Sequence, residues 1–248
     1  MKKRLLRSLI PLGLYPHINF TYSPLKVLEF GRIMDRCDLQ GDETALDIGC
    51  GDGLHTLLIG RRVGAVTGID INGDFVADAR TFAAAMGDRV KADFRACPIE
   101  KCDFPDAHFD VIFSICVIEH IPNYEEVLRE AWRSLKPGGR MVFTVDTLET
   151  ITDPELVASH QAQHHVMQYF REDTLGELLR GTGFVDIEFE QLFRSPLARE
   201  LFERGIRHGF NFGRFKTPQL ARKLERAEAA VPANAPGIFL LADARKPA

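Results

Sequence analysis

The sequence predicts an α/β fold built on a mainly parallel sheet with helices on both faces. Short apolar strands alternate along the chain with segments of helical periodicity. A glycine-rich turn separates the first of these strands from the helix that follows it. Parallel strands need crossover helices, which then cover both faces of the sheet. Ligands of such sheets bind beyond the carboxyl ends of the strands.

The expected elements begin with a helix over 24–39, which would cap the sheet edge or a pocket. The strands are expected at 44–48, 65–70, 89–96, 110–115, 139–146, 184–193 and 237–244, and the helices between them at 54–63, 73–86, 123–135 and 172–182. Residues 147–168 are expected as a loop on the side where a substrate enters. The predicted division is a leader and cap helix over 1–40, a binding domain over 41–194 plus 236–246, and a helical lid over 195–235.

Composition restricts the class of protein. With 45% hydrophobic and 27% charged residues, the 248-residue chain is typical of a globular protein, and a net charge of -4 argues against a nucleic-acid partner. The five cysteines lack the paired spacing of a zinc site, so reduced thiols and a cytoplasmic location are expected. No run is long enough to span a bilayer. The basic N-terminus precedes a short apolar stretch that Pro11 breaks, which leaves open a weak membrane-surface contact or a loosely packed leader.

The glycine-rich turn is the most informative feature of the chain. Gly49, Gly51 and Gly53 follow the first strand, and glycine lets the backbone approach a ligand closely at the start of a helix. Their Gly-x-Gly-x-Gly spacing differs from the Gly-x-Gly-x-x-Gly of dinucleotide-binding folds, which favours S-adenosylmethionine over NAD. Asp70 ends the next strand and is placed to accept hydrogen bonds from ribose hydroxyls.

Further motifs follow in order along the chain. They are Leu46 to Gly53, Asp70, Phe104 to Ile112, Ile118 to Ile121, Leu135 to Gly139, and Gly183 with Phe184. With these motifs the chain resembles the class I S-adenosylmethionine-dependent methyltransferases of the small-molecule type, in particular the quinone-biosynthesis group. The resemblance implies a Rossmann-like, doubly wound, seven-stranded sheet whose last strand is reversed.

The resemblance implies S-adenosyl-L-methionine as the cofactor and assigns its contacts. The methionine portion would lie along the backbone of Gly49, Cys50, Gly51 and Gly53, with Asp47 near its amino group. Asp70 would bind the ribose, and Ile71 would cover one face of the adenine. The remaining contacts would come from Pro98, Ile99 and Ser114. Pro98 stands where many members carry an acid that meets the adenine amino group. The Ile99 backbone and apolar packing are therefore expected to hold the adenine.

The resemblance also raises the question of a metal. Some quinone-type members bind a divalent cation through a Glu-x-x-Glu-His segment, whereas Cys116 stands at the first position here, before Glu119 and His120. Hard cations prefer oxygen ligands, so no metal is expected. The candidate general bases are His120, His164 and His165. The alternatives are a helix-capping role for His120 and a surface cluster without function for the other two.

The predicted function is methyl transfer by in-line displacement to a small-molecule or lipid-like acceptor, with oxygen or carbon favoured. The segment from Arg194 to Arg226 contains nine basic residues and three acidic ones, with aromatic residues interleaved. This lid suits an anionic or amphiphilic acceptor or a membrane face, and the alternative is a cover whose charges are solvated. Two other functions stay open: a non-catalytic S-adenosylmethionine-binding regulatory or partner protein, and a nicotinamide-dependent oxidoreductase. The oligomeric state is not predicted.

Overall fold

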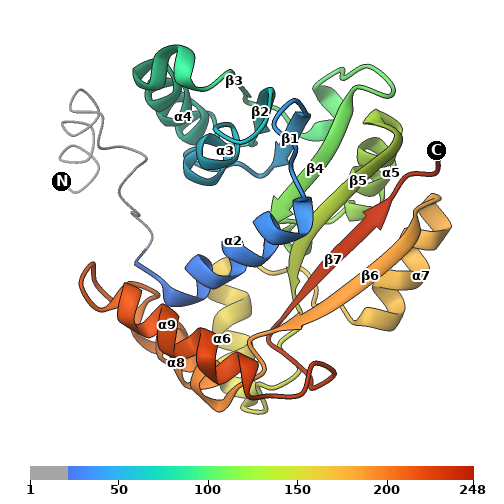
Figure 1. Cartoon of the computed structure of the whole chain (residues 1–248). Helices are drawn as coiled ribbons and strands as arrows, with labels where there is room; N and C mark the ends of the chain where they lie inside the picture. Colours follow the sequence, from blue (N-terminus) through green and yellow to red (C-terminus); the bar gives the residue numbers. More distant parts are fainter. Residues whose placement is uncertain (1–21) are drawn as a thin grey trace.

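The computed structural model describes residues 22–248, which form one seven-stranded sheet in the order β3-β2-β1-β4-β5-β7-β6 (Figure 1). The strands are β1 (Thr44–Ile48), β2 (Ala65–Ile69), β3 (Ala92–Arg95), β4 (Phe109–Ile115), β5 (Leu135–Asp146), β6 (Val185–Leu192) and β7 (Phe239–Arg245). The first five are parallel to one another, and β7 runs antiparallel to both β5 and β6. The predicted sheet with a reversed last strand is confirmed.

The helices lie in two layers on the sheet (Figure 1). They are α2 (Pro24–Cys37), α3 (Leu54–Ile59), α4 (Gly73–Met86), α5 (Tyr124–Ser134), α6 (Pro154–His164), α7 (Glu172–Thr182), α8 (Pro196–His208) and α9 (Thr217–Ala229). One apolar core joins the sheet to α2, α3, α4, α8 and α9, and the other joins it to α5 and α7. Burial on both faces explains why the central strands read as nearly continuous apolar runs.

Two local predictions were wrong. Helix α3 ends at Ile59 rather than at residue 63, because Gly60 follows and donates its N–H to the carbonyl of Thr56. The expected loop 147–168 contains helix α6, which begins with Asp153 accepting from two backbone N–H groups. Asp153 followed by Pro154 is a helix-start signal, so the sequence did contain it. Its weak amphipathic pattern hid the helix.

The expectation of five reduced thiols was also wrong. Cys97 and Cys102 form a disulfide, with their Cα atoms 5.7 Å apart, and three cysteines are free in the described part of the chain. A 3-10 turn over Ile99–Lys101 folds the chain back between the two partners. This turn brings the thiols together, and their spacing in the sequence does not reveal it.

The membrane questions are only partly answered. Among residues 22–248, no helix combines the length and the apolar character that crossing a bilayer requires. The basic leader, for which a membrane-surface contact was left open, lies outside the described residues.

The helices α8 and α9 form the segment between β6 and β7 that was predicted as a helical lid, and a buried carboxylate fixes this segment to the sheet. Glu228 of α9 accepts hydrogen bonds from the backbone N–H groups of Arg194 and Ser195, each at 2.9 Å. Its side chain is 4% exposed and also lies 3.5 Å from the guanidinium of Arg194. Since Arg194 and Ser195 connect β6 to α8, this one side chain joins both lid helices to the sheet edge.

Replacing Glu228 by alanine should therefore destabilise the protein by roughly 2–4 kcal/mol, because two backbone donors and a guanidinium would lose their buried partner. Urea unfolding would measure the loss. Glu225→Ala, on an exposed position of the same helix, is the matched control and should stay within about 0.5 kcal/mol of the wild type. Equal stabilities of the two variants would contradict this anchor.

Candidate functional site

The glycine loop leaves β1 at the carboxyl edge of the sheet. The N–H groups of Gly49 and Cys50 both donate to the carbonyl of Ile69, at 2.8 and 2.9 Å, which bends the chain away from the strand. Gly49, Gly51 and Gly53 have φ values of 78°, 53° and 80°, a region that side chains disfavour. The loop therefore needs glycine for its backbone conformation as well as for access.

Close packing adds a second requirement at Gly49. A Cβ atom placed there would lie 2.4 Å from a methyl carbon of Val117, which follows β4. A Cβ at Gly51 would meet nothing within 4 Å, so this residue faces open space. The loop is thus packed against β4 on one side and open on the other, as a cradle for a ligand requires.

Asp70 holds the loop from the neighbouring strand. Its carboxylate accepts from the N–H of Gly51 at 2.9 Å and from the N–H of Asn72 at 2.8 Å. Asn72 in turn caps helix α4 by accepting from two N–H groups of its first turn. The carboxylate is therefore fixed at the end of β2, beside the glycine loop, where a ribose was predicted to bind.

A cleft of about 300 Å³ opens in front of this loop, at the ends of β1, β2, β3 and β4. Its walls include Gly49, Asp70, Ile71, Cys97, Pro98, Ile99, Val117 and His120. Ile71 is a large apolar side chain that is 81% exposed beside the cleft. An exposed isoleucine opposite Pro98 and Ile99 suits the two faces of a flat ring, and Asp70 offers a carboxylate to hydroxyls. These residues fit an adenosyl group.

Three of the predicted cofactor contacts point away from the cleft. Asp47 is buried and accepts a hydrogen bond from the hydroxyl of Thr56, and burial raises the pKa of its carboxyl to about 7. Ser114 donates to the carbonyl of Ile48 at 2.9 Å. The thiol of Cys50 is buried, which raises its pKa. Asp47 and Ser114 therefore hold the strand ends in place, and the cofactor contacts predicted for all three stay predictions.

The three candidate bases lie near one another, with Nδ1 of His120 3.5 Å from the backbone carbonyl of His165, but they differ in exposure. His120 lines the cleft, and burial lowers the pKa of its imidazole, so the ring is neutral at neutral pH. His164 and His165 lie exposed at the end of α6. His160 of the same helix is instead buried, 3.2 Å from the hydroxyl of Tyr169 and 3.6 Å from the carboxylate of Asp146. A catalytic role for any histidine stays a prediction.

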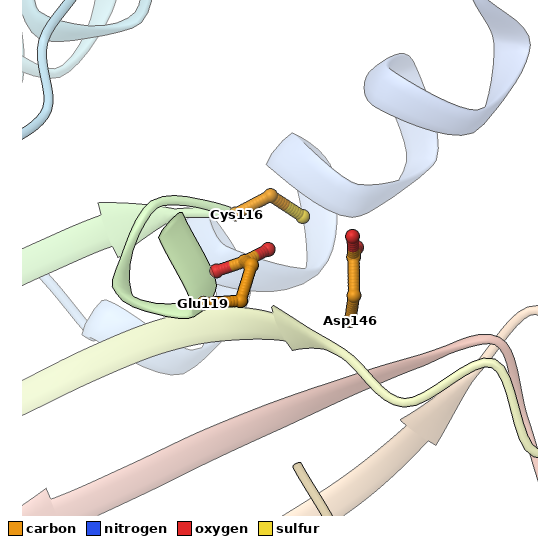
Figure 2. A group of neighbouring side chains, drawn as sticks. All are labelled: Cys116, Glu119 and Asp146. Atoms are coloured by element: carbon orange, nitrogen blue, oxygen red, sulfur yellow. The ribbon is translucent and has the colours of Figure 1, made fainter. Parts of the chain in front are cut away.

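A buried charged group lies next to the cleft, and the sequence analysis missed most of it. The group consists of Lys26, Glu29, Cys116, Glu119 and Asp146. One side-chain atom from each of Cys116, Glu119 and Asp146 lies within 4.8 Å of the other two, and Figure 2 shows the three converging below helix α2. Asp146 ends β5 as Asp70 ends β2, which is a signal the sequence contained.

Comparisons with known proteins agree with this geometry. A family model described as a methyltransferase domain matches residues 46–143. Ubiquinone biosynthesis O-methyltransferases are similar in sequence. The one from Paramagnetospirillum magneticum is 43% identical over 164 residues, which are 66% of this chain and 59% of that protein. The one from Idiomarina loihiensis is 30% identical over 183 residues, or 68% of this chain and 73% of that protein.

Solved structures share the fold. Phosphoethanolamine N-methyltransferase 2 of Haemonchus contortus, in complex with S-adenosyl-L-methionine, superposes with a TM-score of 0.66 at 23% identity over 89% of this chain and 53% of that one. Geranyl diphosphate C-methyltransferase of Streptomyces coelicolor gives 0.67 at 18% identity over 90% and 76%. The chain spans about three fifths of the Paramagnetospirillum relative and half of the Haemonchus enzyme.

The chain belongs to the S-adenosylmethionine-dependent methyltransferases, and S-adenosyl-L-methionine is the cofactor of this family. The predicted family, fold and cofactor are thereby confirmed, and the nicotinamide-dependent alternative is set aside. The glycine spacing was the feature that separated the two, whereas an acid after the second strand is common to both.

The packing at Gly49 yields a prediction. Gly49→Ala adds a methyl group at a positive φ and against Val117, so the loop must shift and the affinity for S-adenosylhomocysteine should fall about tenfold or more. Titration calorimetry would measure it. Gly73→Ala, at an open position without a positive φ at the start of α4, should bind as the wild type does. Unchanged affinity in Gly49→Ala would show that the loop is not the cradle.

Proposed function

We propose that this protein transfers a methyl group from S-adenosyl-L-methionine to a small-molecule acceptor, and that the methylated atom of the acceptor is an oxygen. The observation that carries the proposal is the cleft in which the glycine loop, the fixed carboxylate of Asp70 and the exposed face of Ile71 converge. When bound there, the cofactor supplies an electrophilic methyl group on a sulfonium sulfur. The residues of the chain bind and orient the reactants and exclude water.

The names of the relatives support a small acceptor. The two relatives described above are O-methyltransferases of ubiquinone biosynthesis, while the two structural neighbours act on phosphoethanolamine at nitrogen and on geranyl diphosphate at carbon. Oxygen is favoured because the closer sequence similarity is to the O-methyltransferases. A phenolic hydroxyl on a quinone-like ring is the acceptor class that fits these names best.

The acceptor would enter between α2, α6 and the lid, at the carboxyl ends of β4 and β5. The lid carries the local basic excess, and an anionic or amphiphilic acceptor remains part of the proposal. Some of its cations already have partners: Arg207 lies 3.3 Å from Glu203 and 3.9 Å from Asp153, and Arg204 lies over the ring of Phe212. A weak contact with a membrane surface and a cytoplasmic location are also part of the proposal.

The test of the proposal begins with the cofactor. Asp70→Ala should weaken S-adenosylhomocysteine binding by about ten- to a hundredfold, because a carboxylate that holds both the loop and the ribose contributes about 1.5–3 kcal/mol. Asp74→Ala, an exposed acid in the first turn of α4, is the matched control and should leave the affinity unchanged. Calorimetry against NAD should give no binding for either variant or for the wild type.

Turnover needs a second measurement. Protein incubated with methyl-labelled S-adenosylmethionine and a panel of phenols, catechol first, should yield labelled product that Asp70→Ala forms more slowly. A wild type that binds the cofactor but labels neither these phenols nor any compound of cell-extract fractions would favour the non-catalytic alternative and refute the enzymatic proposal.

A further inference from the structure

Three carboxyl groups and one ammonium group meet in the buried charged group. Glu29 and Glu119 are fully buried and Asp146 is 3% exposed. Lys26 supplies the ammonium group from α2, and Cys116 adds a thiol from the end of β4. Other titratable side chains near the group include His160 from α6, Tyr169, His55 from α3 and His120 beyond Glu119. One positive charge cannot balance three carboxylates, so the group must hold protons.

Among the three carboxyl groups, Glu29 is the one that has both a cation and hydrogen-bond donors as partners. Its side chain lies 2.8 Å from the ammonium of Lys26. It also accepts from the hydroxyl of Thr144 at 2.6 Å and from the thiol of Cys116 at 3.0 Å. Glu29 is therefore paired with the ammonium group of Lys26.

Glu119 and Asp146 are left without an equivalent cation. No donor among residues 22–248 reaches either oxygen of Glu119. Asp146 lies within 4.8 Å of Glu119, and its nearest basic group is the imidazole of His160 at 3.6 Å. Burial and the charge of Glu29 raise the pKa of the Asp146 carboxyl to about 7, although the nearby ammonium of Lys26 acts in the opposite direction. Burial and the charge of Asp146 raise the pKa of the Glu119 carboxyl well above its usual range. Two such neighbours cannot both be ionised.

We propose that Glu119 and Asp146 share one proton and that this carboxyl pair accepts the proton of the acceptor hydroxyl during methyl transfer. The inference rests on the proposed function, and its site is the carboxyl edge of β4 and β5 beneath α2 (Figure 2). Val117 and His120, on either side of Glu119 in the sequence, both line the cofactor cleft. The pair is thus next to the place where the methyl group is transferred.

The step balances in atoms and charge. The acceptor oxygen forms a bond to the methyl carbon, while the bond from that carbon to sulfur breaks and leaves its electron pair on sulfur. The hydroxyl proton passes to the singly protonated pair, which changes from a charge of -1 to neutral. The pair later releases this proton to solvent. A buried carboxyl pair is suited to this task because its proton affinity is close to the working pH.

The first measurement tests the shared proton without any acceptor. When a carboxyl has a higher pKa in the folded than in the unfolded state, the folded state binds more protons between the two pKa values, and stability falls as pH rises through that window. The urea midpoint of the wild type should therefore fall between about pH 5 and pH 8. Asp146→Asn and Glu119→Gln should each fall less steeply. Asp47 contributes equally to all variants, so it cancels in the differences.

Glu149→Gln is the matched control, since Glu149 is an exposed acid three residues beyond Asp146. Its difference from the wild type should not vary with pH. A carbonyl stretching band of a protonated carboxyl, seen by infrared spectroscopy at neutral pH in the wild type, should disappear or shift in Asp146→Asn. Parallel pH profiles of wild type, Asp146→Asn and Glu119→Gln would overturn the shared proton.

The second measurement tests the use of the pair, with catechol and methyl-labelled S-adenosylmethionine. Glu119→Gln and Asp146→Asn should each lower kcat about a hundredfold or more, keep the KM for the cofactor, and lose the rise of kcat with pH. Asp146→Glu should recover part of the rate. A retained rate in both variants, or a rate that a chelator abolishes and a divalent cation restores, would overturn the proposal.

Calorimetry distinguishes a failure of the proposed function from a failure of the proposed carboxyl pair. If the wild type does not bind S-adenosylhomocysteine, the proposed function fails. If the wild type and both variants bind it equally while their pH profiles coincide, the proposed function stands and only the carboxyl pair is refuted.

Discussion

Three successive backbone N–H groups of the glycine loop are held by the end of a single neighbouring strand. Those of Gly49 and Cys50 donate to the carbonyl of Ile69, and that of Gly51 donates to the carboxylate of Asp70. These hydrogen bonds turn the chain out of β1 and leave its open side facing the cleft. Because β1 and β2 are parallel and in register, the two strand ends meet at the same edge, and the loop can form only there.

The hydrogen bonds that fix the glycine loop also determine the path of the chain after β4, because the two segments are closely packed. With the loop fixed, the space beside Gly49 accommodates Val117, which sets the path of the chain after β4. That path includes Cys116, which turns at a φ of 50°, and the 3-10 turn Ile118–His120 that carries Glu119. The position of the buried charged group thus depends on hydrogen bonds made two strands away. The cofactor cleft and the carboxyl pair are parts of one edge of the sheet.

Much of this edge could be predicted from the sequence because the signals are local. The spacing of Gly49, Gly51 and Gly53 and the acid at the end of the second strand predicted the cleft, and strand alternation predicted the sheet. The disulfide of Cys97 and the inward turn of Asp47 depend on how loops fold back, which no local pattern encodes. Lys26 and Glu29 read as ordinary charges on a helix face. Only the docking of α2 over β5 shows that Glu29 is buried and that the half-buried Lys26 lies near Asp146.

The docking of α2 brings residues from outside the matched region to the buried charged group. The family match covers residues 46–143, whereas Lys26 and Glu29 lie before it and Asp146 lies just after it. Arg36, near the end of α2, lies 2.6 Å from Glu188 of β6, and Glu29, near its start, accepts a hydrogen bond from Thr144 of β5, so polar contacts hold the helix against the sheet at both ends. Burying three carboxyls and an ammonium group is costly, and apolar side chains of similar volume would serve stability as well or better. Such groups are concentrated where proteins do chemistry. The cofactor cleft therefore lies within the region that the family model matches, whereas the buried charged group includes Lys26, Glu29 and Asp146 from outside that region.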